Sequence, residues 1–564
     1  MKTGFLKRYE LVLLVGLMLV VTVPFIGQAV QHDAHQFIDF AKMELDHPLW
    51  QHLQDYDYFG VHYHGSDYHD THPRLQSLYL SLWLRVDHVN LAPWALHLEM
   101  LIFPLIVVVA MYFLARRFKV NAFIATLLMV VAPAFLVANH LIMIDVPGVA
   151  FWLAAMVFFI KGVDDDRIVY LLAGALCLSL AVFTYYQDLS LLPLIFLYML
   201  LKRKVNARTV TALAIPVMLF LAFVAAHFAY YGQPPNFTYT FGQPMDLHSI
   251  IVRIRGTIAL LGGVLLFPMA AIAIYSRIRW INFVALAVLV VTIIWSAIYY
   301  LQGMFVADDL LLLPWLMAGG VMMLLFILRK LANAAPLTLV QAGGTDDVIL
   351  AVWFLGIFFY NCILLPYPSS RYLIPLIPPA AIFATREIQR MWGSDRRQLV
   401  IATGIIAGTT LALALAVAIG ENERANMNPV EAEWAAVHYP PDGHVWFNGG
   451  LGFQYYMQQK GYPMALVDGD GVKKGDYIVE SINNRWYFSG DFIYRLELVQ
   501  TVDFPRSWPV ATEYHAAGTS WLGIIGMDTP YGFTGAYQDR LYIYKVITSP
   551  EDEQLCRLRP PAAE

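Results

Sequence analysis

The sequence predicts an all-α polytopic membrane protein of about 13 transmembrane helices, followed by a small C-terminal α/β domain. Hydrophobic residues make up 59% of the 564 positions and charged residues only 14%, whereas a soluble protein carries roughly 25% charged residues. The mean hydropathy is +0.55. Apolar runs near the length that crosses a bilayer recur up to residue 420 and are missing after it. The net charge of −5 argues against nucleic acid as a partner, because nucleic acids bind basic surfaces.

The membrane part begins with an apolar run that follows Lys2, Lys7 and Arg8. This run is long enough to be a retained helix rather than a cleaved signal peptide. In chain order, the expected spans are 10–28, 94–115, 121–140, 146–161, 168–184, 187–201, 209–231, 257–275, 281–301, 310–328, 349–366, 371–385 and 398–420.

Two stretches need a separate interpretation. Residues 168–201 would form one helix of about 51 Å, which is too long for a bilayer, so Tyr185–Asp188 is predicted to turn the chain between two spans. Leu75–Val86 is too short to cross and is followed by Asp87 and His88. We expect it to be an interfacial or re-entrant helix.

The orientation follows from the positive residues of the short loops, which favour the cytoplasmic side. With the N-terminus inside, the loops after alternate spans carry most of the lysines and arginines. This bias persists along the whole membrane part and places the C-terminal domain outside. The weakest expected span is 371–385, which is short and holds Pro375, Pro378 and Pro379.

Two domains are expected: a transmembrane domain over residues 1–420, with a first outer loop at 29–93, and an outer α/β domain over residues 421–564. The second mixes β-rich and helical stretches that turn signals separate. The β-rich stretches are Val445–Phe447, Asp476–Glu480 and Leu541–Val546, and the helical ones are Pro429–Val437 and Phe453–Lys460.

On this topology, unusual polar residues of the membrane part gather on the outer side. Ionisable side chains near span ends tend to face cavities and to carry function, although solvated loops also contain charges. The residues concerned are Asp33, His35, Asn139, His140, Asp145, Asp188, Arg253, Arg255, Asp308, Asp309 and Arg371.

Four motifs on this side resemble the GT-C superfamily of polyprenyl-phosphate-sugar-dependent glycosyltransferases. They are the acidic first loop His32–Phe37, the His-Pro segment Asp70–Leu75, the segment Ile144–Gly148, and the Arg-Tyr-Leu-x-Pro segment Ser370–Pro375. The chain is most similar to the bacterial relatives of protein O-mannosyltransferases and of the lipid A aminoarabinose transferase. It departs from the family pattern at Arg74, where a second proline is usual.

The resemblance implies a membrane enzyme that moves a sugar, with inversion, from a polyprenyl-phosphate donor to a lipid, glycan or protein acceptor. It further implies action at the outer face of the cytoplasmic membrane. A transporter or flippase of a lipid-linked glycan is the alternative. Transporters usually place ionisable groups at the bilayer midplane, in two related halves, and this sequence shows no matching halves.

Two acidic residues are candidates for the catalytic site. Asp33 is the natural base, because a carboxylate at the membrane boundary can take the proton of an attacking hydroxyl. Direct displacement needs only one such carboxylate. Asp145 is the second candidate, to orient the acceptor or to assist a metal. It is also well placed to cap a helix that Pro147 begins.

Four basic residues are candidates for binding the donor phosphate. Arg371 leads, since a guanidinium offers planar, multidentate donors to phosphate oxygens. Arg253 and Arg255 come next, just before a span, where they could also be a snorkelling interfacial pair. His72 is the fourth.

The first outer loop is unusually rich in histidine. His62, His64, His69 and Asp70 are tentative ligands of a divalent metal ion (Mg²⁺, Mn²⁺ or Zn²⁺). Such an ion would neutralise the leaving phosphate. The spacing fits no standard zinc template, so a solvated or aromatic-packed loop stays open as the alternative.

Overall fold

The computed structural model describes most of the chain. The described residues are 2–46, 55–58, 60–63, 73–86, 92–232, 234–235, 246–275, 279–305, 307–341, 344–365, 367–467, 471–484, 495–510, 512, 529–533 and 537–548.

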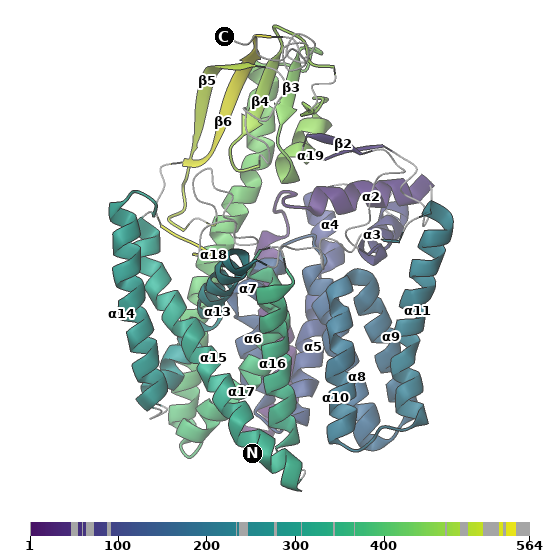
Figure 1. Ribbon diagram of the computed structural model, residues 1–564, viewed down its shortest axis with the longest axis vertical. Coiled ribbons are helices and arrows are strands. Elements are labelled where there is room, and N and C mark those ends of the chain that lie inside the picture. Colours follow the sequence, from purple (N-terminus) through teal and green to yellow (C-terminus); the bar gives the residue numbers. More distant parts are fainter. Residues whose placement is uncertain are drawn as a thin grey trace.

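A bundle of apolar helices forms the lower part of the molecule (Figure 1). Within the described residues, eight helical segments are long and apolar enough to cross a membrane. They are α4–α5 (Pro93–Met100 and Ile102–Arg117), α8 (Asp145–Asp165), α11 (Ala207–Tyr231), α13 (Leu247–Tyr275), α14 (Arg279–Leu301), α15 (Ala307–Gln341), α16 (Thr345–Ile363) and α18 (Arg396–His438). Shorter apolar helices are found in α1 (Lys2–Thr22), α9 (Ile168–Thr184) and α10 (Leu191–Leu201).

The other two expected spans are interrupted. Residues 121–140 form α6 (Ala122–Val130) and α7 (Pro133–Ala138), and residues 371–385 form the 3₁₀ helix η4 (Arg371–Leu376) and the start of α17 (Ile377–Trp392). Proline causes both breaks, because it lacks the N–H of a helical hydrogen bond and its ring clashes with the preceding turn. The predicted turn at 185–188 is also present, as η3 (Tyr186–Ser190).

The outer helices of the bundle have the character of lipid-facing surfaces. α11 and α14 lie at opposite sides of the bundle in Figure 1. Only 17% of the apolar window of each is buried inside the protein. Apolar surface of this extent needs an apolar environment. The predicted polytopic membrane protein is thus confirmed.

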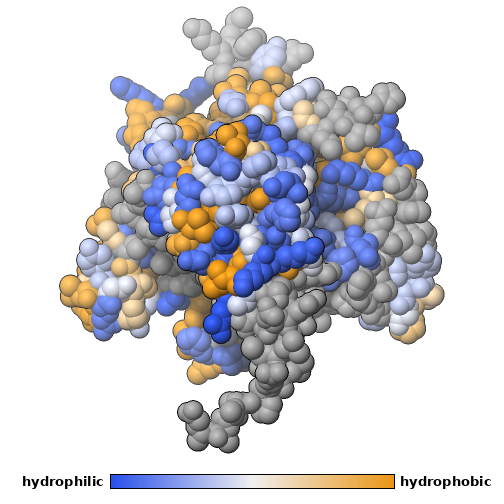
Figure 2. Space-filling view, turned by 90° about the horizontal axis from the view of Figure 1, so that it is seen from above, coloured by the Kyte–Doolittle hydropathy of each residue, from blue (hydrophilic) through white to orange (hydrophobic). Residues whose placement is uncertain are grey.

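A small domain stands above one end of the bundle, and α18 runs into it from below (Figure 1). Its four-stranded sheet has the order β3-β4-β6-β5, and only the pairing of β3 with β4 is parallel. The bounds are β3 Val445–Asn448, α19 Leu451–Gln459, β4 Tyr477–Ser481, β5 Leu496–Pro505 and β6 Tyr537–Val546. Seen from above, the central part of this face is mostly hydrophilic (Figure 2). The predicted α/β composition is confirmed, whereas the division at residue 420 stays a prediction, since α18 crosses that point unbroken.

Between the bundle and this domain lie two amphipathic helices, α2 (Ala34–Asp46) and α3 (Leu75–Val86) (Figure 1). α3 has the bounds expected of the interfacial helix. A short hairpin of β1 (Tyr56–Tyr58) and β2 (Val61–Tyr63) also belongs to this first outer loop. The described parts of this loop therefore form helices and a hairpin, and they lie under the upper domain.

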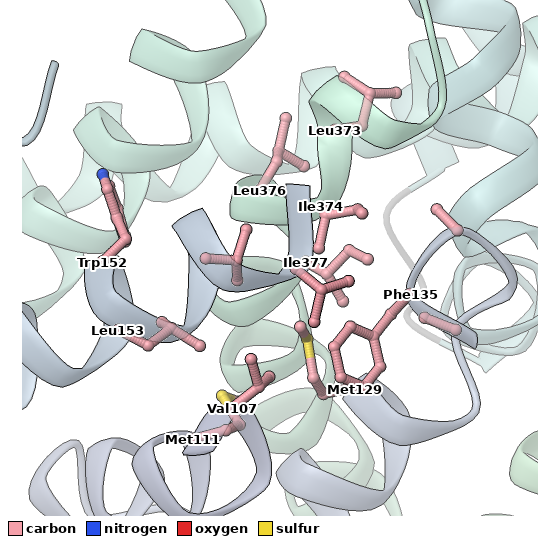
Figure 3. Packing of buried hydrophobic residues seen from close by; sticks show 14 of the residues in the cluster. Val107, Met111, Met129, Phe135, Trp152, Leu153, Leu373, Ile374, Leu376 and Ile377 are labelled. Carbon is pink, nitrogen blue, oxygen red and sulfur yellow. The ribbon is translucent and has the colours of Figure 1, made fainter. Parts of the chain in front are cut away.

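The main core joins α5, α6, α7 and α8 to η4 and α17. Leu373, Ile374 and Leu376 of η4 are each at most 1% exposed. They belong to the same buried cluster as Phe135 and Met129, and Ile374 lies on the side of η4 nearer to these two residues (Figure 3). Because η4 buries its apolar side chains there, its first residue is held in a fixed place on the surface of this core.

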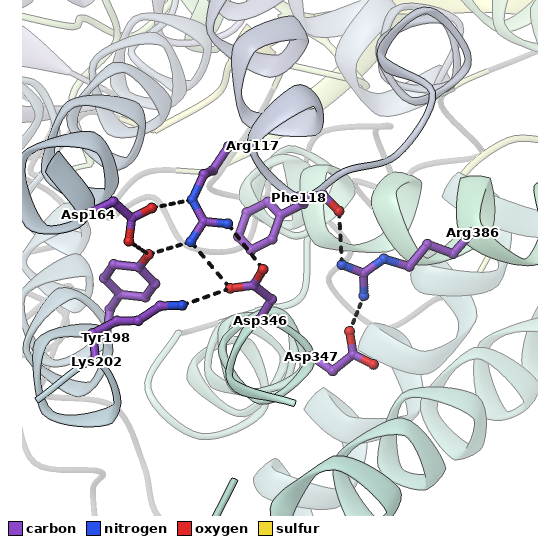
Figure 4. Close-up of polar contacts among 8 residues, drawn as sticks. All are labelled: Arg117, Phe118, Asp164, Tyr198, Lys202, Asp346, Asp347 and Arg386. Carbon is purple, nitrogen blue, oxygen red and sulfur yellow. Dashed lines mark hydrogen bonds and ion pairs between the residues drawn. The ribbon is translucent and has the colours of Figure 1, made fainter. Parts of the chain in front are cut away.

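The end of the bundle away from the upper domain is closed by a polar network (Figure 4). Arg117 of α5 pairs with Asp164 of α8, donates to the Tyr198 hydroxyl at 2.7 Å, and lies 3.1 Å from Asp346 of α16. Arg386 of α17 pairs with Asp347 alongside. Five helices (α5, α8, α10, α16 and α17) thus take part in polar contacts at the end where the loops are rich in lysine and arginine.

Candidate active site

Three of the predicted residues meet at the upper end of the bundle. Arg371, the first residue of η4, places Nη1 3.7 Å from Asp33 Oδ2 and 4.0 Å from Asp145 Oδ2. Asp33 directly precedes α2, and Asp145 begins α8. Residues from three distant parts of the sequence therefore form one cluster, in which a single guanidinium faces two carboxylates.

Asp33 is the most accessible member of this cluster. Its side chain is 21% exposed, against 9% for Arg371 and 4% for Asp145. The Tyr58 hydroxyl donates to Asp33 Oδ1 at 2.9 Å, while the Asp33 carbonyl accepts from the backbone N–H of Gln36 at 3.0 Å. A carboxylate at a helix N-terminus is stabilised as an anion. Asp33 is thus an oriented, partly solvated carboxylate beside a cation.

Asp145 lies deeper, and a second buried acid accompanies it. Asp188 of η3 is 5% exposed. A Cβ atom added at Gly148 would lie 3.0 Å from Asp188 Oδ2. Gly148 stands one helical turn after Asp145, so the lack of a side chain there lets Asp188 approach α8. Sequence reasoning placed Asp188 on the outer side without giving it a role.

A pocket opens beside these acids. Among the described residues, several of its buried polar atoms have no hydrogen-bond partner: Asp145 Oδ2, Asp188 Oδ2, Gln187 Nε2, Tyr360 Oη and Asn361 Oδ1. Buried polar atoms are almost always satisfied. These atoms give the pocket a polar lining next to Asp145 and Arg371. The sequence did not predict the pocket residues between α9 and α10 or on α16, because single polar residues in apolar runs are usually structural.

The two other arginines contact other parts of the bundle. Arg253 of α13 is 2% exposed and donates through Nη1 to the carbonyl of Leu365 at 3.2 Å. It therefore lies beside the chain that leads to η4. Arg255 stacks over the Trp295 ring of α14 at 5.1 Å. Their role in phosphate binding stays a prediction.

Only one residue of the predicted metal site is described. His62 of β2 pairs with the carboxylates of Asp57 at 2.5 Å and Asp55 at 3.6 Å, and the hydrogen bond that its Nδ1 donates to Asp57 raises the pKa of His62. His64, His69, Asp70 and His72 lie outside the described residues. Within the described ranges, no group of three or more histidine, cysteine or acidic residues could hold a metal ion.

Comparisons with known proteins give a family match over part of the chain and a similarity of fold. Residues 71–230 match the family described as dolichyl-phosphate-mannose-protein mannosyltransferase, a segment that includes Asp145 and Asp188. The fold is similar to that of ArnT from Cupriavidus metallidurans, solved with undecaprenyl phosphate. That match has 15% identity and a TM-score of 0.50, and covers 85% of this chain and 94% of that one.

Two further solved structures are less similar. The Archaeoglobus fulgidus oligosaccharyltransferase AglB has 12% identity, a TM-score of 0.48 and coverage of 85% and 70%. The S. cerevisiae Pmt1-Pmt2 complex has 16% identity, a TM-score of 0.31 and coverage of 42% and 35%. No curated protein sequence matches the chain. The family match over residues 71–230 and the fold shared with ArnT bear out the resemblance of this chain to the GT-C superfamily.

Proposed function

We propose that this chain, a membrane glycosyltransferase of the GT-C superfamily, moves a sugar from a polyprenyl-phosphate donor to a hydroxyl group of a lipid, glycan or protein. The observation that carries the proposal is the cluster of Asp33, Asp145 and Arg371. It combines a base, a buried acid and a cation at one end of an apolar bundle. The undecaprenyl phosphate bound to the similar ArnT structure supports the class of donor.

The reaction is a single displacement at the anomeric carbon. Asp33 takes the proton of the acceptor hydroxyl while the oxygen of this hydroxyl bonds to the anomeric carbon. The bond from the carbon to the phosphate oxygen breaks on the opposite face, so the configuration inverts and polyprenyl phosphate leaves with the electron pair. The hydrogen bond from Tyr58 fixes one oxygen of Asp33, and the other oxygen is turned towards Arg371.

Arg371 binds the phosphate of the donor. Its guanidinium donates to phosphate oxygens in a planar fork and balances the charge that grows as the bond breaks. Asp145, 4.0 Å away, holds this guanidinium in place. We assign Arg253, Arg255 and His72 as further cationic contacts along the path of the carrier. No step depends on a metal ion, and a metal-binding role of the histidine-rich loop stays a proposal.

The location of the reaction follows from the predicted topology. With the N-terminus inside, the cluster and residues 421–564 lie outside the cytoplasmic membrane. The excess of lysine and arginine at the opposite end of the bundle supports this orientation.

Mass spectrometry of envelope glycolipids and glycoproteins tests the proposal. We compare cells that carry the wild-type chain, Asp33→Asn, Asp39→Asn or a deletion. Asp39 is the matched control, since it lies on α2 and pairs with Lys42 at 2.8 Å. Loss of a general base costs about 10²–10⁴-fold in rate, so one glycan should lack a sugar in the deletion and in Asp33→Asn only.

The same experiment separates the transport alternative. If Asp33→Asn behaves as wild type while the deletion accumulates a lipid-linked precursor inside the cell, the chain is a transporter and Asp33 is no base.

A further inference from the structure

We infer that the outer domain sets the position of Asp33. Residues of α18 and α19, which we call the clamp (Glu421, Arg424, Asn426, Asn428, Gly452 and Tyr456), hold the four residues that directly precede Asp33. This inference rests on the proposed role of Asp33 as the base and assigns positioning residues to a domain that sequence analysis leaves without a function.

The clamp first fixes the backbone at two consecutive residues. The N–H of Ala29 donates to Asn426 Oδ1 at 3.0 Å, and the N–H of Val30 donates to the Tyr456 hydroxyl at 3.0 Å. The amide of Asn428 donates to the carbonyl of Val30 at 3.5 Å. These bonds join segments about 400 residues apart in the sequence and leave the chain before Asp33 little freedom.

Buried charges then fix the next two residues. Arg424 Nη1 lies 2.9 Å from Gln31 Oε1 and 3.0 Å from His32 Nε2, and His32 Nε2 lies 2.6 Å from Glu421 Oε1. Each of these side chains is at most 5% exposed. Arg424 Nη1 also lies 3.5 Å from Glu421 Oε1. Loss of either partner would leave an uncompensated buried charge, so these contacts hold residues 31 and 32 in one arrangement.

His32 itself has an unusual backbone conformation. Its φ is +51°, in the left-handed region that residues other than glycine rarely adopt. This turn directs the next residue, Asp33, away from the clamp and towards Arg371. Such a conformation persists only where neighbouring contacts stabilise it. The clamp supplies these contacts.

Gly452 allows the N-terminal end of α19 to lie directly against residues 30–31. A side chain at this position would lie 2.3 Å from Asn428 Nδ2, 2.4 Å from the carbonyl oxygen of Val30 and 2.9 Å from Gln31 Cα. The N-terminal end of α19 is therefore in direct contact with the backbone that leads to Asp33. An added methyl group would have to push residues 30–31 aside.

The same domain also holds the tyrosine that donates to Asp33. Tyr58 belongs to the β1–β2 hairpin. Gln454 of α19 donates to the carbonyl of Asp57 at 2.7 Å, and the N–H of Val467 donates to the carbonyl of Gly60 at 2.8 Å. The base and its hydrogen-bond donor thus share one support. Arg371 has a different one, because η4 is packed into the core of the bundle.

This separation makes the inference testable in the full-length protein. Gly452→Ala should lower kcat by about 10²-fold, the loss expected when a catalytic group shifts by about 1 Å. The Kd for undecaprenyl phosphate should stay within about twofold, because Arg371 is not disturbed. The control is Gly404→Ala on α18, where an added side chain meets nothing within 4 Å.

A second pair of variants removes a single hydroxyl group. Tyr456→Phe deletes the acceptor of the Val30 N–H and should lower kcat severalfold. Tyr455→Phe is its matched control, since no hydrogen bond joins the Tyr455 hydroxyl to residues 29–32 in the described structure. It should match wild type.

The outcomes separate the two proposals. The inference is overturned if Gly452→Ala and Tyr456→Phe keep the wild-type kcat, or if they lose carrier binding and thermal stability together with kcat. If the wild-type chain transfers no sugar, or Asp33→Asn is fully active, the proposed function itself fails.

Discussion

At the scale of single residues, the sequence was most informative about ionisable side chains at the ends of membrane spans, where burying a charge is costly. Asp33, Asp145 and Arg371 could be predicted because ionisable groups near span ends are rare and usually functional. Asp188, Tyr58 and the pocket residues could not be assigned, because hydroxyl, amide and loop carboxyl groups are common in structural positions as well. Their convergence depends on packing between segments that have no common sequence pattern.

Arg371 permits a direct test of phosphate binding. Arg371→Lys keeps the charge but loses the planar fork of donors, and Arg371→Met loses both. We expect the affinity for undecaprenyl phosphate to fall by about tenfold in the first and by about 10²-fold in the second. Isothermal titration in detergent measures this. Arg390→Met, at the opposite end of the bundle, should bind as wild type.

His32 gives a pH dependence whose sign can be worked out. Burial, with Arg424 adding to the effect, lowers the pKa of His32 to about 4. Above pH 6.5, His32 is neutral in both the folded and the unfolded chain, and stability is complete. As the pH falls from about 6.5 to about 4, only the unfolded chain takes up the proton, and about 3 kcal/mol of stability is lost.

Thermal melts of the purified protein between pH 4 and pH 7 measure this effect. His32→Gln should flatten the fall in melting temperature over that window. An unchanged pH dependence in His32→Gln would show that another group causes it.

At the scale of elements, apolar runs predicted the helices well, and proline explains the exceptions. Pro133 and Pro375 lie where expected single spans become two shorter helices. β5 was not predicted. Leu496, Leu498, Val502 and Phe504 alternate along it, but Gln500 interrupts this pattern and most of the side chains are exposed. β5 forms because it pairs with β6, and a pairing between distant segments cannot be seen in the local sequence.

The Arg117 network ties helices together at the end far from the cluster. Asp346→Ala removes a partner of Arg117 and Lys202, whose side chains are a quarter to a third exposed, so the loss of stability should be only about 1 kcal/mol. We expect a lower melting temperature with unchanged kcat. Asp165→Ala, at the same end of α8, is the control. A fall in kcat would mean that the two ends of the bundle are coupled.

At the scale of the whole molecule, the distribution of lysine and arginine predicts which side each end faces. Cysteine labelling in intact cells checks this in a chain whose native cysteines are replaced. An impermeant maleimide should label His444→Cys in the outer domain and should not label Ser394→Cys between α17 and α18. Both native side chains are exposed. The reverse pattern would invert the topology.

The fold of each half could be anticipated from the sequence, whereas their contact could not. The clamp joins residues near 30 to residues near 425 and 455 through a few polar bonds. No composition or spacing predicts such a contact, because each partner is an ordinary polar residue in its own segment.

The clamp has a consequence for how the enzyme is made. Asp33 is translated long before residues 421–456, which hold the backbone ahead of it. A nascent chain that ends before α18 already contains Arg371 and the earlier apolar helices, yet it lacks the whole clamp that orients Asp33. On the proposed function, such a chain binds the lipid carrier through Arg371 but transfers its sugar only slowly. Full activity therefore begins only once the clamp has been synthesised and has packed against residues 29–32.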